Sequence, residues 1–298
     1  MIMKLIEITA GAYYLSGATN LGVVATPGGG AVLIDTGQDK DQAKRLLKAC
    51  EAAGLTPRAI INTHGHADHF GGNEYLVRKT GVPTYAPPFE EAFITYPYLE
   101  PFYLFSGARP IAPLKTKWLL AGPSRVEQII EGGTLEVEGL AFQVLSFPGH
   151  AHGQIALGWG EVLYCADALF GGDVLAKYGL PYATDVGAQI QSIKRLQATK
   201  FKNYLPGHGP LTNDIRPLCV ANLDAIERGL EAVLQATSST SETTKVVTKA
   251  SQALGIVMIN IPQYYLFKSI IKAYLSYLVE EGQVVFTLEE NRLLWQRV

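Results

Sequence analysis

The stretch "INTHGHADHFGG", residues 61–72, constrains both the fold and the chemistry of this chain. Its centre, "HGHADH", places three histidines and an aspartate in six positions, whereas the chain has only six histidines in 298 residues. The stretch begins at the end of "RAIIN", residues 58–62, whose apolar centre is typical of a buried strand. On a turn that leaves a strand, this spacing can aim neighbouring side chains at two points a few ångströms apart, as a dinuclear metal site requires.

The other histidines occupy similar positions further along the chain. His150 and His152 stand in "SFPGHAHGQ" and His208 stands in "LPGHGP", each in a loop after a predicted strand. Asp167, in "YCADALF", also lies where a strand is expected to end. A lone histidine would be interpreted as a core or surface residue. A set of nitrogen and carboxylate ligands at strand ends predicts a site for a borderline divalent cation.

The pattern of short apolar segments and Gly, Pro and Asn turns predicts two sheets packed face to face with helices outside. Helical spacing of apolar residues, with stop signals, predicts helices over 39–50, 71–81 and 185–198, and residues 86–125 are expected to be irregular. The predicted strands cover residues 3–9, 12–15, 21–26, 31–35, 58–62, 134–147 as a hairpin, 155–159 and 162–167, and a last strand is expected within "NYLPGHG", residues 203–209.

A different pattern begins near residue 213. Helices are predicted near 222–236, at 243–253 and across 262–282, followed by a hairpin of 283–288 and 292–298. This order predicts a winged-helix-like domain over 213–298 after a catalytic domain over 1–212. From residue 211 onward eight Lys and Arg side chains face nine Asp and Glu side chains. Since a groove binder carries a basic patch, this balance favours packing or dimerisation over nucleic-acid binding, which it leaves open.

The motifs "THGHADH", "PGH", "CAD" and "PGHG", in this order, resemble the metallo-β-lactamase superfamily over about residues 1–210. The resemblance implies an α/β fold, a four-layer αββα sandwich with the metals in a cleft at one sheet edge. By position it assigns His64, His66 and His150 to one metal, Asp68, His69 and His208 to the other, and Asp167 as the bridge between them.

Asp35 and His152 lie near these motifs but outside the ligand set. Asp35 of "LIDTG" resembles the family's aspartate beneath the site, although its spacing alone equally fits an aspartate that starts a turn. His152 has no counterpart among the usual ligands. We expect it either to support a ligand or to be exposed in its loop.

The implied site predicts a hydrolase. Two cations about 3.5–4 Å apart lower the pKa of a bridging water toward 7 and supply hydroxide that attacks a carbonyl. Asp68 would orient this hydroxide and pass a proton to the leaving group. Zinc is the favoured metal, with iron or manganese left open. We expect a small-molecule substrate with an ester-like carbonyl, a thioester before a lactone.

Several branches of the superfamily remain as alternatives. Asp167 is typical of the glyoxalase II-like, lactonase and nuclease branches rather than of the β-lactamases. Phe170 stands where the lactonases have a tyrosine, so that "DALF" looks like the "DxLF" of glyoxalase II. The tail resembles that of a branch with a single-strand endoribonuclease. An endoribonuclease, a mononuclear iron persulfide dioxygenase and a non-catalytic winged-helix binder are therefore the alternatives.

Aromatic side chains are candidates for the substrate pocket. Phe93 and Tyr96 belong to an aromatic segment over 89–118 that would form a lid, pack on its own sheet or make a dimer contact. Phe170 follows Asp167 and is a further candidate for the pocket. Tyr178 and Tyr182, in the loop after Asp167, would reach the cleft or, as is favoured, only pack against their surroundings. Glyoxalase II enzymes bind glutathione through basic residues near the site, and no comparable basic cluster is found here.

Composition predicts an ordinary cytoplasmic globule. The formal net charge is −2 and 17% of residues are charged, which indicates neither a nucleic-acid partner nor a membrane surface. The N-terminal segment lacks the pattern of a secretory signal, and no uninterrupted apolar run is long enough to span a membrane. Cys50, Cys165 and Cys219 have no CxxC spacing and are expected to be reduced, buried thiols.

Overall fold

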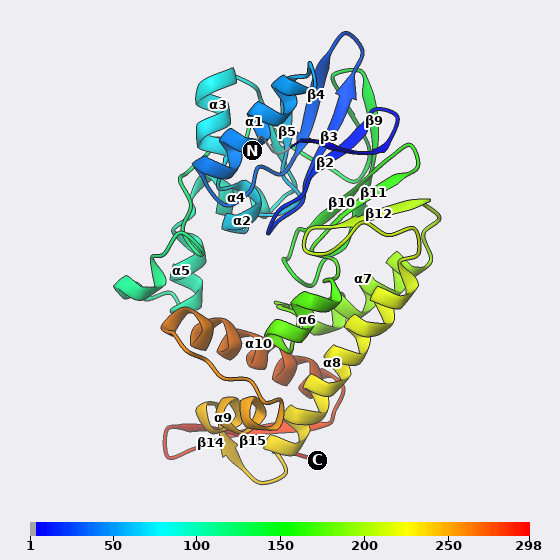
Figure 1. The fold of residues 1–298 in the computed structure, drawn as a ribbon. Coiled ribbons are helices and arrows are strands. Elements are labelled where there is room, and N and C mark those ends of the chain that lie inside the picture. The colour runs from blue at the N-terminus through cyan, green and yellow to red at the C-terminus, as the bar shows by residue number, and fades with distance from the viewer. Residues whose placement is uncertain (1–3) are drawn as a thin grey trace.

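The computed structural model describes residues 4–298 as two sheets packed face to face between layers of helices (Figure 1). Met3, the first residue of the first predicted strand, lies outside the described residues. The first sheet has the order β1-β2-β3-β4-β5-β6-β7. Its strands are β1 (Ile6–Thr9), β2 (Ala12–Leu15), β3 (Leu21–Thr26), β4 (Gly30–Ile34), β5 (Thr56–Ile61), β6 (Thr84–Ala86) and β7 (Gln128–Ile129).

The first sheet changes from antiparallel to parallel pairing at β4. Hairpins join β1 to β4, whereas β4, β5, β6 and β7 run parallel. The carboxyl ends of β4 and β5 therefore meet at one edge, where Asp35 and the HGHADH turn begin. The second sheet has the order β12-β11-β10-β9-β8, from β8 (Gly133–Val137), β9 (Leu140–Ser146), β10 (Ile155–Trp159), β11 (Val162–Ala166) and β12 (Asn203–Pro206).

Alternation along the strands builds the layers. In β4, Ala31 and Leu33 pack on helices, whereas Val32 and Ile34 join Phe142 in the core between the sheets. Helices α1 (Lys40–Ala52) and α3 (Asn73–Thr80) cover the first sheet, and α7 (Val186–Gln197) and α8 (Arg216–Ala236) cover the second (Figure 1). The predicted αββα sandwich is confirmed.

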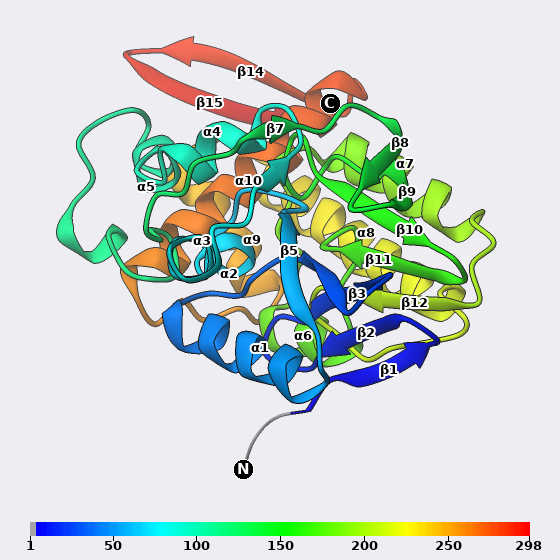
Figure 2. The ribbon, with the colours of Figure 1, turned by 90° about the horizontal axis from the view of Figure 1, so that it is seen from above.

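The segment over 86–125 differs from the prediction. It contains the short helices α4 (Glu90–Thr95) and α5 (Leu99–Leu104) and the 3-10 turn η1 (Ala112–Leu114). Helices this short are marginal by themselves, and these are held by tertiary packing, since Ile94, Leu104 and Leu114 are buried. In Figure 2 the segment reaches toward α10 (Ile261–Glu280), which η1 and α5 contact.

The tail consists of α8, β13 (Ser241–Glu242), α9 (Thr243–Ala253), α10 (Ile261–Glu280), β14 (Val284–Glu289) and β15 (Arg292–Arg297). The three strands form a sheet in the order β13-β15-β14. One apolar cluster joins residues on both sides of the predicted boundary, including Leu196, Val233 and Leu275. The tail thus packs on the second sheet and α7. Its designation as a winged-helix-like domain and the boundary at residue 212 stay predictions.

Two composition-based expectations can be compared with the structure. Cys50, Cys165 and Cys219 are buried free thiols, as predicted. Within residues 4–298, no helix has both the length and the apolar character that crossing a membrane requires.

Candidate metal centre

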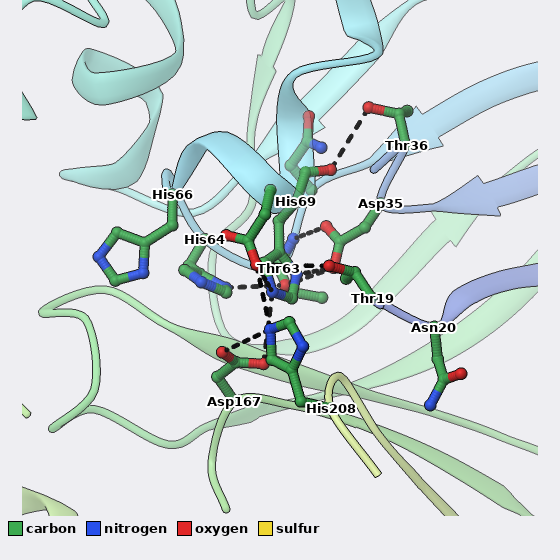
Figure 3. A network of polar contacts seen from close by, with 12 residues as sticks. Thr19, Asn20, Asp35, Thr36, Thr63, His64, His66, His69, Asp167 and His208 are labelled. Atoms are coloured by element: carbon green, nitrogen blue, oxygen red, sulfur yellow. Dashed lines mark hydrogen bonds and ion pairs between the residues drawn. The ribbon is translucent and has the colours of Figure 1, made fainter. Parts of the chain in front are cut away.

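The polar cluster lies where strands of both sheets end. After β5, the turn and the short helix α2 (Ala67–Phe70) carry four of the predicted ligands. Asp167 follows β11, and His208 follows β12 by two residues. His150 comes from the loop between β9 and β10. Figure 3 shows the labelled side chains of His64, His69, Asp167 and His208 turned toward one another.

The first group of ligand atoms comes from His64, His66 and His150. These ring nitrogens lie within 4.8 Å of one another. His66 Nδ1 and His150 Nε2 are 2.8 Å apart, although 84 residues separate them in the chain. The rings of His64 and His66 are nearly perpendicular, with centroids 4.7 Å apart. Three nitrogens from two loops therefore converge on one point.

The second group comes from Asp68, His69 and His208, whose ligand atoms also lie within 4.8 Å of one another. His208 Nε2 is 3.1 Å from Asp68 Oδ2 and 3.3 Å from Asp167 Oδ2. Asp167 lies between the two groups, because its Oδ2 is also 3.3 Å from His150 Nε2 and its Oδ1 is 3.3 Å from His69 Nε2. The geometry thus places one carboxylate within reach of both groups.

Outer hydrogen bonds orient three imidazoles of the cluster, those of His69, His150 and His208. Asp35 Oδ2 accepts from His69 Nδ1 at 2.7 Å, which turns His69 Nε2 toward the cluster. His150 Nδ1 bonds to the Tyr182 carbonyl oxygen at 3.0 Å, and His208 Nδ1 bonds to the Ala18 carbonyl oxygen at 2.6 Å. Ligating histidines commonly use such partners, which fix the tautomer and leave the other nitrogen free for a metal.

The Asp35 carboxylate has a second role. It accepts two further hydrogen bonds at 2.8 Å, from the Thr63 amide and from the Thr63 hydroxyl, and it is 2% exposed. It therefore ties the end of β4 to the residue before His64. Asp35 thus contacts His69 on the side of the ring opposite to Nε2, and its part in a metal centre stays a prediction.

Burial and nearby charges shift the pKa values of the histidines in opposite directions in the two groups. Burial, together with nearby His150, lowers the pKa of His66 to about 3. Burial also lowers the pKa of His64 far below its ordinary value, with His69 adding to the effect. These two rings are neutral and have lone pairs available at neutral pH.

The second group has the opposite character. Burial opposes the charged form of His69, but the carboxylates of Asp167, Asp35 and Asp68 outweigh it and raise its pKa to about 10. Burial also opposes the charged form of His208, and the two neighbouring aspartates raise its pKa to about 12. The carboxylates thus create a strongly negative position that holds protons, and a bound cation would displace them.

The donor set fits divalent cations. His64 Nε2 and Asp167 Oδ1 are buried, and neither has a hydrogen-bond partner in residues 4–298. Because buried polar atoms are nearly always paired, two such atoms side by side indicate a ligand that takes lone pairs. Imidazole nitrogen and carboxylate oxygen are donors that zinc, iron and manganese accept.

The backbone near Asp167 has little free space. A Cβ atom at Gly207 would lie 2.2 Å from Asp167 Oδ1, so only glycine fits at this position. Asn20 donates to the carbonyl oxygens of Pro206 and Gly209 at 3.0 and 2.7 Å and holds the His208 loop. The sequence analysis did not find Asn20, Thr63 or the Ala18 carbonyl, because main-chain acceptors and single polar side chains leave no recognisable pattern.

The predicted pocket residues have different positions. The ring of Phe170 is 5.4 Å from that of His150, and the ring of Tyr182 is 5.6 Å from that of His66. Phe93 contacts Tyr103, whose hydroxyl is 2.7 Å from the Tyr182 hydroxyl. These three predicted residues therefore lie at or near the cluster.

The other residues predicted to lie at or near the site, Tyr96, Tyr178 and His152, are on the surface. Tyr96 and Tyr178 are 67% and 51% exposed, and no ring contact in the described part of the chain joins either to the histidines. His152 is exposed, and its ring lies 4.7 Å from that of Phe89. The structure does not bring these three side chains to the cluster.

The sequence profile of the metallo-beta-lactamase superfamily matches residues 16–208, more than half of the chain. The chain belongs to the metallo-beta-lactamase superfamily. The matched residues of this superfamily member begin just after β2 and end at His208, so they include all seven clustered ligand candidates.

Relatives of this superfamily member include a hydroxyacylglutathione hydrolase of Xylella fastidiosa, 33% identical over 145 residues. That match covers 48% of this chain and 43% of the relative, so less than half of the relative's length is represented. A lactamase-like protein of Pestalotiopsis microspora is 27% identical over 79% of this chain and 62% of its own length.

Solved structures of other proteins share the fold of this chain over nearly its whole length. A beta-lactamase domain protein from Burkholderia ambifaria has a TM-score of 0.76 at 18% identity and covers 100% of this chain and 94% of its own. A metallo-beta-lactamase family protein from Thermus thermophilus has a TM-score of 0.74 at 22% identity and covers 98% of this chain and 100% of its own. The likeness in fold therefore extends through the tail.

Proposed function

We propose that this protein is a dinuclear metal-dependent hydrolase that acts on an ester-like carbonyl, a thioester before a lactone. The observation that carries the proposal is the position of Asp167. Its two oxygens are 3.3 Å from nitrogens of both groups of ligand candidates, so one carboxylate can serve two ions.

The proposed ligands are His64, His66 and His150 for one ion and Asp68, His69 and His208 for the other, with Asp167 shared. Zinc is the proposed metal, and iron and manganese are the alternatives. When bound, a pair of such cations lowers the pKa of water toward about 7 and polarises a carbonyl oxygen.

Asp68 is the proposed catalytic carboxylate. Its side chain is 28% exposed, whereas that of Asp167 is 4% exposed, so Asp68 is on the open side of the cluster. Its Oδ2 accepts from the Thr19 hydroxyl at 3.3 Å and is 3.1 Å from His208 Nε2. These contacts orient the carboxylate, and Oδ1 is the oxygen that takes up a proton and returns it to the leaving group.

Two observations support a carbonyl over a phosphodiester. The ion pairs of the cluster in residues 4–298 are all between histidine and aspartate, whereas a phosphate backbone is bound by Lys and Arg. The rings of Phe170 and Tyr182 beside His150 offer an apolar surface. The relatives named hydroxyacylglutathione hydrolase also favour a thioester, the linkage that joins an acyl group to glutathione.

The proposed partner is a small molecule, and a homodimer remains open. The first test measures thiol release by the metal-loaded protein from lactoylglutathione and short acyl-CoAs. Wild type should turn over at least one of them, and Asp68→Ala should reduce kcat by about 10²–10⁴-fold, the range for general acid–base catalysis. Asp41→Ala, which removes an exposed carboxylate of α1, is the matched control and should keep full activity.

The remaining alternatives predict different results. Thiol release that Asp68→Ala retains would refute the proposed mechanism. No turnover of any thioester, together with cleavage of labelled RNA, would favour the endoribonuclease. No turnover with one iron per chain would favour the persulfide dioxygenase, and a mobility shift with nucleic acid without any cleavage would favour a non-catalytic binder.

A further inference from the structure

Glu90 is a buried carboxylate that connects two loops of the metal centre. It lies in the first turn of α4 and is 2% exposed. Its Oε2 accepts a hydrogen bond from the Gly65 amide at 2.8 Å, and its Oε1 accepts one from the Gly153 amide at 2.7 Å. Gly65 belongs to the HGHADH turn, and Gly153 lies three residues after His150. One side chain therefore bridges the two loops that supply the first group of histidines.

Close backbone contacts accompany these hydrogen bonds. A Cβ atom at Gly65 would lie 2.6 Å from Phe93 Cβ and 3.0 Å from the Glu90 carbonyl oxygen. A Cβ atom at Gly153 would lie 2.3 Å from the Pro88 carbonyl oxygen. Main-chain and Cβ atoms cannot move aside as the tip of a flexible side chain can. The segment 88–93 is therefore fitted directly against both loops.

The two amides are the main hydrogen-bonding partners of this carboxylate. Burial raises the pKa of Glu90, and the amides of Gly153 and Gly65 lower it in part. Hydrogen bonds from amides to a carboxylate are short, strong and directional. Because one carboxylate takes both, it fixes the distance between the two amides and hence between the loops.

We propose that Glu90 is a positioning residue of the metal centre, whose carboxylate holds the HGHADH turn against the His150 loop so that three histidines converge on one ion. This inference rests on the proposed function, because it requires that these histidines bind metal.

The second group of ligands is oriented by other contacts. His69 is held by Asp35 and His208 by the Ala18 carbonyl oxygen. Neither contact involves α4. Loss of the Glu90 bridge should therefore weaken the ion at His64, His66 and His150 and spare the ion at Asp68, His69 and His208.

The test compares zinc binding by wild type, Glu90→Gln and Glu91→Gln in competition with a chromophoric chelator. Glutamine keeps the size of Glu90, but its carbonyl oxygen can accept from one amide only, and its NH₂ group then faces the other N–H. Glu91 is in the same turn of α4, so Glu91→Gln removes the same charge without changing the two bonds. NMR of the imidazole ring protons identifies which histidines bind the retained ion.

We expect wild type and Glu91→Gln to bind two ions with the same affinities. Glu90→Gln should keep one affinity and lose about 10–100-fold in the other, the usual effect of removing an outer partner of metal ligands. The imidazole signals of His64, His66 and His150 should then match those of the metal-free protein at low zinc.

Unchanged affinities in Glu90→Gln would overturn the inference. Equal weakening of both ions with a lower thermal midpoint of the metal-free protein would also overturn it, since that result indicates general destabilisation. Wild type that binds no metal would overturn the proposed function itself, whereas two ions in wild type leave that function standing whatever the variant does. If Glu90→Gln does not fold, Glu90→Asp, which is too short to reach both amides, should show the same selective loss.

Discussion

Replacing Asp35 with asparagine tests whether the hydrogen bonds of Asp35 orient His69 for metal binding. The carboxylate accepts three hydrogen bonds, from the Thr63 amide, the Thr63 hydroxyl and His69 Nδ1, at 2.7–2.8 Å. An asparagine has one acceptor oxygen, so its NH₂ group must face at least one of these donors. A buried donor without its acceptor costs about 1–3 kcal/mol. If the NH₂ group faces His69, the ring protonates Nε2 instead, and that nitrogen cannot bind a cation.

The expected result is weaker binding of the ion at Asp68, His69 and His208, because Asp35 contacts His69 directly. Loss of an outer partner typically weakens metal binding by about 10–100-fold, which corresponds to about 1.4–2.8 kcal/mol at about 1.4 kcal/mol per tenfold. Zinc affinity is measured by chelator competition, and urea unfolding of the metal-free protein gives the change in stability separately.

Asp185→Asn is the matched control. Asp185 caps α7 by accepting from the Ala188 amide at 2.8 Å, and asparagine caps helices equally well. This control should keep both zinc affinities within about twofold of wild type. The same result for Asp35→Asn would refute the reasoning, because Asp35 would then not determine the tautomer of His69.

Three further predictions concern other parts of the molecule. Burial raises the pKa of Glu100 from 4.5 to about 8, so the folded chain keeps a proton that the unfolded chain loses. The free energy of unfolding should therefore fall as pH rises from about 4.5 to about 8, by at most about 5 kcal/mol at about 1.36 kcal/mol per pKa unit. In urea unfolding, Glu100→Gln should show a smaller fall over this pH range than wild type. The same pH profile in the variant and in wild type would contradict the prediction. Gly207→Ala places a Cβ atom against Asp167 and should weaken both ions, which metal analysis after dialysis would detect; two ions per chain at wild-type affinity would exclude the clash. Phe142→Ala removes a fully buried ring from the core between the sheets and should cost about 3–5 kcal/mol in urea unfolding, whereas a loss below about 1 kcal/mol would mean that the sheets repack around the gap.

The sequence determined most of the local structure. Alternating apolar residues and turn residues predicted the strands from β2 to β5, which the structure contains at nearly the same bounds. Helix α1 begins at Lys40, directly after the capping Asp39, where the pattern placed its start. These features depend on neighbouring residues, so the chain itself specifies them.

The short helices α4 and α5 depended on tertiary structure. Each has six residues, too few to be stable alone, and each is held by a buried side chain, Ile94 or Leu104. The sequence pattern of 86–125 therefore predicted an irregular segment. For the same reason it could not separate Phe93, which reaches Tyr103, from Tyr96, which is exposed.

The sequence by itself determined which side chains are ligand candidates, because "HGHADH", "PGH" and "CAD" name them one by one. Only the tertiary structure decided that His66 and His150, 84 residues apart, lie 2.8 Å from each other. Likewise, the Ala18 carbonyl reaches His208 across 190 residues. Such contacts between distant residues depend on the register of the sheets and on the packing of loops, and therefore on the whole chain. A sequence motif contains only residues that are adjacent in the chain.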